Sequence, residues 1–182
     1  ALVVRLKPKA QRAAAHRPRE LPVAVNMLNI LVLCTGNSCR SVMAEGLLNY
    51  YGKGRFKAFS AGSSPSGFVH PMSLATLKAN GISAEGFRSK SWDEFTGHPL
   101  EIVITVCDNA AGEVCPLFMG APVKSHWGVP DPAHFKGTEA EISAEFQRIF
   151  DILAARVKAL VTLPDSLDKQ TLAVKLKEIG TL

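Results

Sequence analysis

A cysteine, a glycine-containing turn and an arginine follow one another within residues 34–41, which read Cys-Thr-Gly-Asn-Ser-Cys-Arg-Ser. The segment comes directly after an apolar run, residues 28–33, that is long enough for a buried strand. Backbone N–H groups in such a turn form a concave anion site, and the start of a following helix adds its dipole. Arg40 can contact a tetrahedral oxyanion through two parallel hydrogen bonds. We call residues 34–41 the anion loop.

Cys34 is the candidate nucleophile of this loop. The positive field of the turn and the helix is expected to lower the pKa of its thiol, so that the thiolate forms near neutral pH. A buried structural cysteine in an ordinary glycine turn is the alternative. Ser41 could donate a hydrogen bond to the thiolate or merely cap the helix, and Cys39 is expected to pack beneath the loop as a small apolar group. The expected anion-binding residues are Thr35, Gly36, Asn37, Ser38, Cys39, Arg40 and Ser41.

Strand-like and helix-like stretches alternate after Met27. The predicted strands are residues 28–33, 56–61, 102–106 and 123–127, and the predicted helices are residues 41–51, 71–80, a long one from the capping box Thr138/Glu141, and 168–179. This alternation predicts a single α/β domain, residues 27–182, with a four-stranded parallel sheet and helices on both faces. Ligands of such folds bind beyond the carboxyl ends of the strands, which is where the anion loop lies.

Residues 1–26 differ from the rest of the chain. They hold six of the 21 Lys and Arg residues but one of the 16 Asp and Glu residues, so the net charge of +5 is confined to them. They are rich in Ala, Arg and Pro and show no apolar period, which predicts a disordered basic extension with Met27 as a plausible natural start. A mitochondrial-type transit peptide is the alternative, although the segment lacks serine.

The composition excludes several classes of protein. The chain of 182 residues has 47% apolar and 20% charged residues, which is typical of a globular protein. No apolar run is long enough for a membrane span, and outside the extension no basic face predicts nucleic-acid binding. Four cysteines in a chain of this length do not make a disulfide scaffold. We therefore expect a cytoplasmic protein whose cysteines serve packing, metal binding or chemistry.

Several motifs resemble one known family. The sequence of the anion loop resembles that of the arsenate reductases built on the low-molecular-weight tyrosine phosphatase fold. Two further motifs share this resemblance, Met43-Ala44-Glu45-Gly46 and Phe59-Ser60-Ala61-Gly62. The similarity continues through Thr105-Val106-Cys107-Asp108 and Cys115-Pro116 to residues 126–133, His-Trp-Gly-Val-Pro-Asp-Pro-Ala. It covers roughly residues 28–161. The resemblance implies flavodoxin-like winding of the sheet, and Asp131 as the general acid that protonates the leaving oxygen.

Reduction needs more than the anion loop, because phosphate and arsenate are nearly isosteric. A reductase requires two electrons, most simply from a second thiol at the same end of the sheet. Cys107 follows a predicted central strand and meets this requirement, and a folded loop could bring Cys115 within bonding distance of it. By resemblance, Cys107 resolves the arsenic adduct and Cys115 carries the oxidation outward to a thiol donor. Half of a zinc site is the alternative for this pair, but no further ligands accompany it.

The resemblance also bears on a possible potassium site and on the identity of the electron donor. Some thioredoxin-coupled relatives bind potassium beneath the anion loop, and the matching positions are Asn37, Glu45, Ser60 and Trp92. Tryptophan cannot ligate a hard cation, and the segment between Cys107 and Cys115 is one residue longer than in those relatives. Asp93 is adjacent to Trp92, so potassium stays an open but disfavoured alternative; no other cofactor is expected, and glutaredoxin with glutathione competes with thioredoxin as the electron donor.

Two other functions stay open beside arsenate reduction, with phosphate and sulfate as competing anions. A low-molecular-weight protein tyrosine phosphatase would use the same loop, but Ala133 stands where that family usually places an aromatic residue. A cysteine phosphocarrier of a sugar-uptake system shares the architecture but needs no arginine in the loop, so Arg40 disfavours it.

Overall fold

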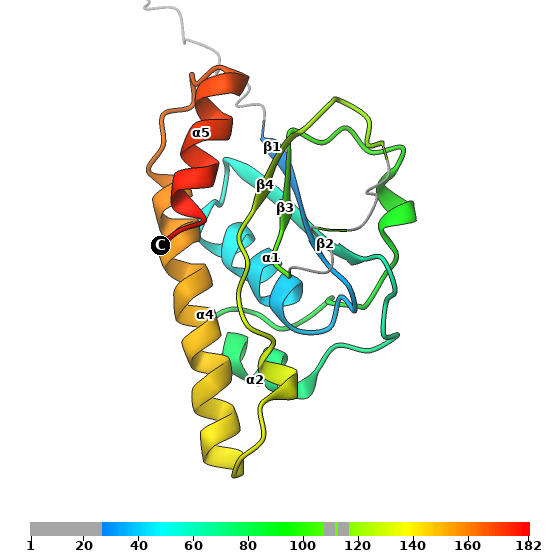
Figure 1. Cartoon of the computed structure of the whole chain (residues 1–182), viewed down its shortest axis with the longest axis vertical. Coiled ribbons are helices and arrows are strands. Elements are labelled where there is room, and N and C mark those ends of the chain that lie inside the picture. The colour runs from blue at the N-terminus through cyan, green and yellow to red at the C-terminus, as the bar shows by residue number, and fades with distance from the viewer. Residues whose placement is uncertain (1–26, 108–111, 113–116) are drawn as a thin grey trace, which may run out of the picture.

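The computed structural model describes residues 27–107, 112 and 117–182. Their β-strands form one parallel sheet in the order β2-β1-β3-β4, with β1 at Leu28–Cys34, β2 at Phe56–Gly62, β3 at Ile102–Thr105 and β4 at Val123–His126 (Figure 1). All three strand pairs are parallel. The predicted four-stranded parallel sheet and its winding are confirmed, and each strand end lies within one residue of its predicted position.

Four α-helices of the described residues lie on one side of the sheet: α1 (Arg40–Tyr51), α2 (Pro71–Ala79), α4 (Glu139–Val161) and α5 (Lys169–Ile179) (Figure 1). Their apolar side chains meet Ile30 and Val32 of β1 in the larger core cluster. A smaller cluster on the opposite face joins Leu31 and Leu33 to Phe95 of the 3-10 helix η1, Trp92–Phe95. Helical segments thus cover both faces of the sheet.

The helix ends follow local signals in the sequence. The capping box of Thr138 and Glu141 is present at the start of α4, and the Asp168 side chain caps α5. Pro71 occupies the first turn of α2. Gly81, just after that helix, has a φ of +75°, a conformation that glycine adopts without a steric penalty. Two short 3-10 helices, η1 and η2 (Pro132–His134), were not predicted, because neither carries an apolar period.

None of the helices in the described ranges is long and apolar enough to cross a membrane. Residues 1–26 lie outside the described part, so the predicted extension is not tested by the structure.

Candidate active site

The anion loop joins the end of β1 to the start of α1, and it is held by the loop that follows β2. Ser64 and Ser66 donate their backbone N–H groups to the carbonyls of Thr35 and Gly36, at 3.0 and 2.9 Å. Gly62 makes this approach possible, because a Cβ there would lie 2.3 Å from the Thr35 carbonyl oxygen. The carbonyls of the loop are therefore engaged from outside the anion site.

Cys34 lies at the base of this loop and is 4% exposed. The backbone N–H of Asn37 donates to its sulfur at 3.2 Å, and the Ser41 hydroxyl lies 2.8 Å from the same sulfur. Asn37 has a positive φ of 44°, which turns the loop back over the cysteine. Both loop residues thus place a hydrogen-bonding group against the sulfur of the candidate nucleophile.

The pKa of Cys34 shifts in the direction opposite to the sequence expectation. Burial raises the pKa of the Cys34 thiol, and the hydrogen bonds from Ser41 and Asn37 only partly offset this, while the nearby Cys107 raises it further. The expectation of a lowered pKa was wrong because it counted the loop dipoles and omitted the desolvation of the thiolate.

Arg40 and Asp131 form an ion pair beside the anion loop. Arg40 Nη2 lies 2.7 Å from Asp131 Oδ2, and Nη1 donates to the Val129 carbonyl at 3.1 Å. Asp131 also accepts the Ala133 backbone N–H at 3.1 Å, which caps η2 and fixes the loop after β4. Because a guanidinium has five donors, Arg40 can hold this loop and still face a bound oxyanion.

The sheet brings Cys107 to the edge where Cys34 lies. Leu33 of β1 pairs with Thr105 of β3, so Cys34, the last residue of β1, and Cys107, two residues after β3, lie at the same edge of the sheet. Cys107 is buried, and its sulfur lies 3.5 Å from the Thr35 hydroxyl of the anion loop. The predicted second thiol is therefore adjacent to the predicted nucleophile. Cys115 lies outside the described residues, so its pairing with Cys107 is not tested.

Cys39 and Ser38 lie on the protein side of the loop. Cys39 belongs to the larger core cluster, and burial raises the pKa of its thiol to about 11. Ser38 accepts hydrogen bonds from His70 and Ser73 of the α2 segment through its carbonyl oxygen. Cys39 thus packs as a protonated, largely apolar side chain. Cys34 and Cys107 belong to the same core cluster, but the Cys34 sulfur accepts the Asn37 N–H of the loop and Cys107 lines the cavity over the loop.

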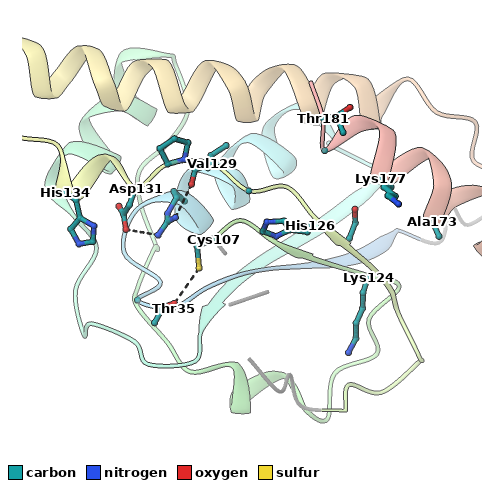
Figure 2. A pocket seen from close by; sticks show the side chains of 16 residues that line it. Thr35, Cys107, Lys124, His126, Val129, Asp131, His134, Ala173, Lys177 and Thr181 are labelled. Carbon is teal, nitrogen blue, oxygen red and sulfur yellow. Dashed lines mark hydrogen bonds and ion pairs between the residues drawn. The ribbon is translucent and has the colours of Figure 1, made fainter. Parts of the chain in front are cut away.

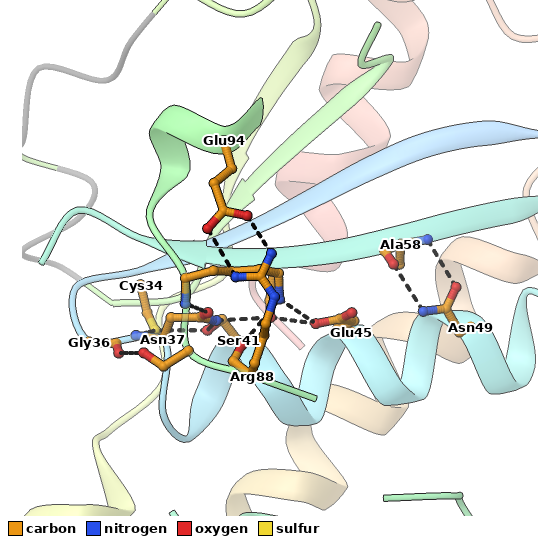
Figure 3. Close-up of polar contacts among 12 residues, drawn as sticks. Cys34, Gly36, Asn37, Ser41, Glu45, Asn49, Ala58, Arg88 and Glu94 are labelled. Carbon is orange, nitrogen blue, oxygen red and sulfur yellow. Dashed lines mark hydrogen bonds and ion pairs between the residues drawn. The ribbon is translucent and has the colours of Figure 1, made fainter. Parts of the chain in front are cut away.

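The region implied for potassium contains a lysine ammonium group. Lys90 Nζ lies 3.7 Å from Glu45 Oε2, and both side chains are largely buried. Asn37 donates to Ser60 at 2.8 Å, Ser60 donates to Glu45, and the Lys90 backbone N–H donates to Asn37 Oδ1 at 2.9 Å (Figure 3). Burial lowers the pKa of Lys90, and the Glu45 carboxylate beside it acts in the opposite direction. The Lys90 Nζ already stands next to the Glu45 oxygen that a cation would need, so these residues do not fit a potassium ion.

A cavity of about 1270 Å³ opens over the anion site and extends along β4 to α5 (Figure 2). Thr35, Gly36, Arg40, Cys107 and Asp131 line it at one end. Lys124, His126 and Lys177 line the remainder, and the His126 ring nitrogen lies 2.8 Å from the Thr105 hydroxyl.

Sequence reasoning did not identify the contributions of α5 and Lys90, because both depend on tertiary contacts that no local motif signals. Among the described residues, no group of three His, Cys, Asp or Glu side chains could hold a metal ion.

Comparison with known proteins gives one family. The sequence model described as low molecular weight phosphotyrosine protein phosphatase matches residues 29–173. A Bacillus subtilis (strain 168) protein named arsenate reductase is 39% identical over 71% of this chain and 91% of its own length. One from Halalkalibacterium halodurans is 37% identical over 74% and 95%. The solved structure titled "An arsenate reductase in the phosphate binding state" aligns with a TM-score of 0.62 and 28% identity, over 74% of this chain and 97% of that one. The chain belongs to the low molecular weight phosphotyrosine protein phosphatase family.

Proposed function

We propose that this protein is an arsenate reductase that works by a cysteinyl adduct and an internal thiol relay. The observation that carries the proposal is the position of Cys107, whose sulfur lies 3.5 Å from Thr35 in the anion loop. Hydrolysis of a phosphate ester uses one cysteine and water, whereas reduction needs two electrons, which come most simply from a second thiol at this place. The names of relatives at 37–39% identity support the same activity.

The first step forms the bond between Cys34 and arsenic. The anion loop and Arg40 hold the oxyanion, and the Cys34 sulfur attacks in line with a departing oxygen. Asp131 accepts hydrogen bonds from Arg40 and Ala133 in the resting site, so it must first take up a proton from solvent; it then donates that proton to a hydroxyl oxygen of arsenate, which leaves as water. Because burial raises the pKa of Cys34, its own proton must leave during the attack, and a dianionic arsenate offers an oxygen that can accept it. Ser41 and the Asn37 N–H then stabilise the charge developing on sulfur.

The second step reduces the arsenic. The Cys107 thiolate attacks the Cys34 sulfur, a disulfide forms between them, and the electron pair of the sulfur–arsenic bond passes to arsenic. Arsenic(V) becomes arsenic(III) and leaves as arsenite, while the two cysteines together lose two electrons. Cys115 then attacks Cys107 and releases Cys34. Thioredoxin, or glutaredoxin with glutathione, supplies two electrons to the final disulfide, which places the reaction in a reducing compartment such as the cytoplasm.

The proposal is tested by counting thiols. The pure reduced protein is mixed with arsenate but no added thiol, and free thiols and arsenite are measured after quenching. A reductase loses two thiols for each arsenite released, and phosphate or sulfate slows the reaction by competing for the anion loop. Cys34→Ser should release no arsenite, because an alcohol is far less acidic than a thiol. Unchanged thiols together with hydrolysis of an aryl phosphate would instead indicate a phosphatase.

A further inference from the structure

The C-terminal helix α5 lies along β4 and packs on Trp127, the first residue of the segment that leads to Asp131 (Figure 1). The family model ends at residue 173, within the first half of α5, so residues 174–182 lie beyond the region that it matches. Lys177, Gly180 and Thr181 nevertheless line the same cavity as Arg40 and Asp131 (Figure 2). Residues beyond the matched region therefore form part of the wall of the candidate active site.

Arg156 of α4 links these residues to the loop after β4. Its guanidinium is buried, with a residue exposure of 6%. Nη1 donates to the carbonyls of Trp127 and Gly128, at 2.8 and 3.2 Å, and Nε and Nη2 donate to the Leu182 carbonyl, at 3.2 and 3.1 Å. All these acceptors are backbone carbonyls, so the guanidinium fixes the course of two chain segments at once.

Trp127 and Gly180 make a second link. The Trp127 side chain is 1% exposed, and its indole N–H donates to the Leu176 carbonyl of α5 at 2.9 Å. Gly180 lies so close to the strand that a Cβ there would stand 2.6 Å from the His126 carbonyl oxygen and 2.8 Å from Trp127 Cδ1. Its φ of −61° suits any residue, so close packing and not backbone conformation is what requires glycine here.

These contacts hold the start of residues 127–131, the segment that ends in Asp131, the proposed general acid. Val129 and Asp131 follow Trp127 by two and four residues, and Arg40 binds both of them at the far end of the segment. We propose that residues 174–182, with Arg156 and Trp127, form a clamp that positions Asp131 over the anion loop. Arg156 and Trp127 are then positioning residues, which act on the reaction through Asp131. The inference rests on the proposed role of Asp131 as the general acid.

The test uses Gly180→Ala in the full chain, with Gly97→Ala as the matched control, since a Cβ at Gly97 meets no atom within 4 Å. The added methyl group should push α5 away from β4.

We expect hydrogen exchange of peptides covering residues 127–131 to become faster. The kcat of arsenate reduction should fall about 10- to 100-fold, the range that a misplacement of about 1 Å produces. The inhibition constant for inorganic phosphate should change much less than kcat, because the added methyl group lies away from residues 34–41, where the anion site changes only through the contacts of Arg40 with Val129 and Asp131. Arg156→Lys, which retains charge but not the planar fork, should act in the same direction.

The outcomes separate the clamp from the proposed function. If kcat and hydrogen exchange stay at the Gly97→Ala level in both variants, or if exchange rises while kcat is unchanged, the positioning role is wrong. An equal loss of kcat and phosphate binding would indicate general structural damage and would also overturn it. If the wild-type protein does not reduce arsenate, the proposed function fails, and unchanged exchange at residues 127–131 would then separately refute the clamp.

Discussion

The Ser41 hydroxyl lies 2.8 Å from the Cys34 sulfur, and it accepts a hydrogen bond from the Asn37 amide nitrogen at 3.0 Å. The amide occupies one lone pair of the hydroxyl oxygen and leaves its proton available to donate to the sulfur once a thiolate forms. The same Asn37 amide group also binds Ser60 and the backbone of Lys90. The side chain of Cys34, the proposed nucleophile, therefore contacts a hydrogen-bond network that continues under the loop to Glu45 and Lys90 (Figure 3).

Ser41→Ala should make the Cys34 thiol less acidic. The Ser41 hydrogen bond lowers the pKa of Cys34 against the effect of burial, so its removal raises that pKa further. A hydrogen bond to a charged group of this kind is worth about 1.5 kcal/mol, or roughly one pH unit. The rate at which iodoacetamide alkylates Cys34 should therefore rise with pH about one unit later than in the wild-type protein.

Ser143→Ala on the exposed side of α4 is the control and should leave the alkylation profile in place. An unchanged profile in Ser41→Ala would show that the hydroxyl serves only the start of α1.

Lys90→Met should destabilise the protein and should do so more at high pH. The change leaves Glu45 largely buried without its cationic neighbour, which costs about 2 to 3 kcal/mol at neutral pH. Burial raises the pKa of Glu45, and losing Lys90 raises it further, so the variant can protonate this carboxyl as the pH falls. Urea titrations at about pH 5.5 and about pH 8 measure the loss in unfolding free energy. This loss should accordingly be smaller at the lower pH.

Lys175→Met removes an exposed ion pair with Glu178 and should change the unfolding free energy by less than about 0.5 kcal/mol. Because the Lys90 ammonium group stands beside Glu45, replacing potassium chloride by choline chloride should alter neither activity nor stability of the wild-type protein. A severalfold activation by potassium would contradict our assignment of this region.

Much of the fold could be predicted because the signals are local. The ends of β1 and β3 follow apolar runs, and the start of α4 follows a capping box that the structure reproduces. The adjacency of Cys107 to the anion loop could also be predicted, since parallel strands deliver their carboxyl ends to one edge.

The remaining features depend on burial and on distant contacts. The raised pKa of Cys34 comes from desolvation by the packed core, which no eight-residue motif records. The placement of Lys90 beside Glu45 joins residues 45 positions apart, and the contacts of Arg156 join α4 to Trp127 and Leu182. Such pairings follow from tertiary structure, so the chain pattern alone gave no reason to single out these side chains.

Deleting residues 1–26 should leave activity unchanged and alter the Tm by less than about 2 °C, which corresponds to less than about 1 kcal/mol. The reason lies in the sequence, where the excess positive charge is confined to this segment and no apolar period gives it a face to bury. Calorimetry and arsenite release of the two forms provide the comparison. A loss of several degrees would mean that the segment packs on the domain.

The two later cysteines distinguish a reductase from a phosphatase. Cys107→Ser should still bind arsenate at the anion loop and form the adduct on Cys34, but it should release no arsenite beyond what an added thiol displaces. Cys115→Ser should complete one turnover and then stall as a disulfide between Cys34 and Cys107, which mass mapping of alkylated peptides identifies. The difference arises because each exchange needs in-line attack of a thiolate on an accessible sulfur, and each variant lacks a different attacking group.

Any hydrolysis of a small aryl phosphate should survive both substitutions, because water completes that reaction and Cys34, Arg40 and Asp131 remain in place. This hydrolysis is therefore the control for an intact anion site. If Cys107→Ser reduces arsenate at the wild-type rate with its thiol donor, an external thiol must attack the adduct directly. The contact of Cys107 with Thr35 would then be structural. The internal relay would have to be replaced by a mechanism in which the thiol donor enters the cavity over the anion loop and attacks the adduct there.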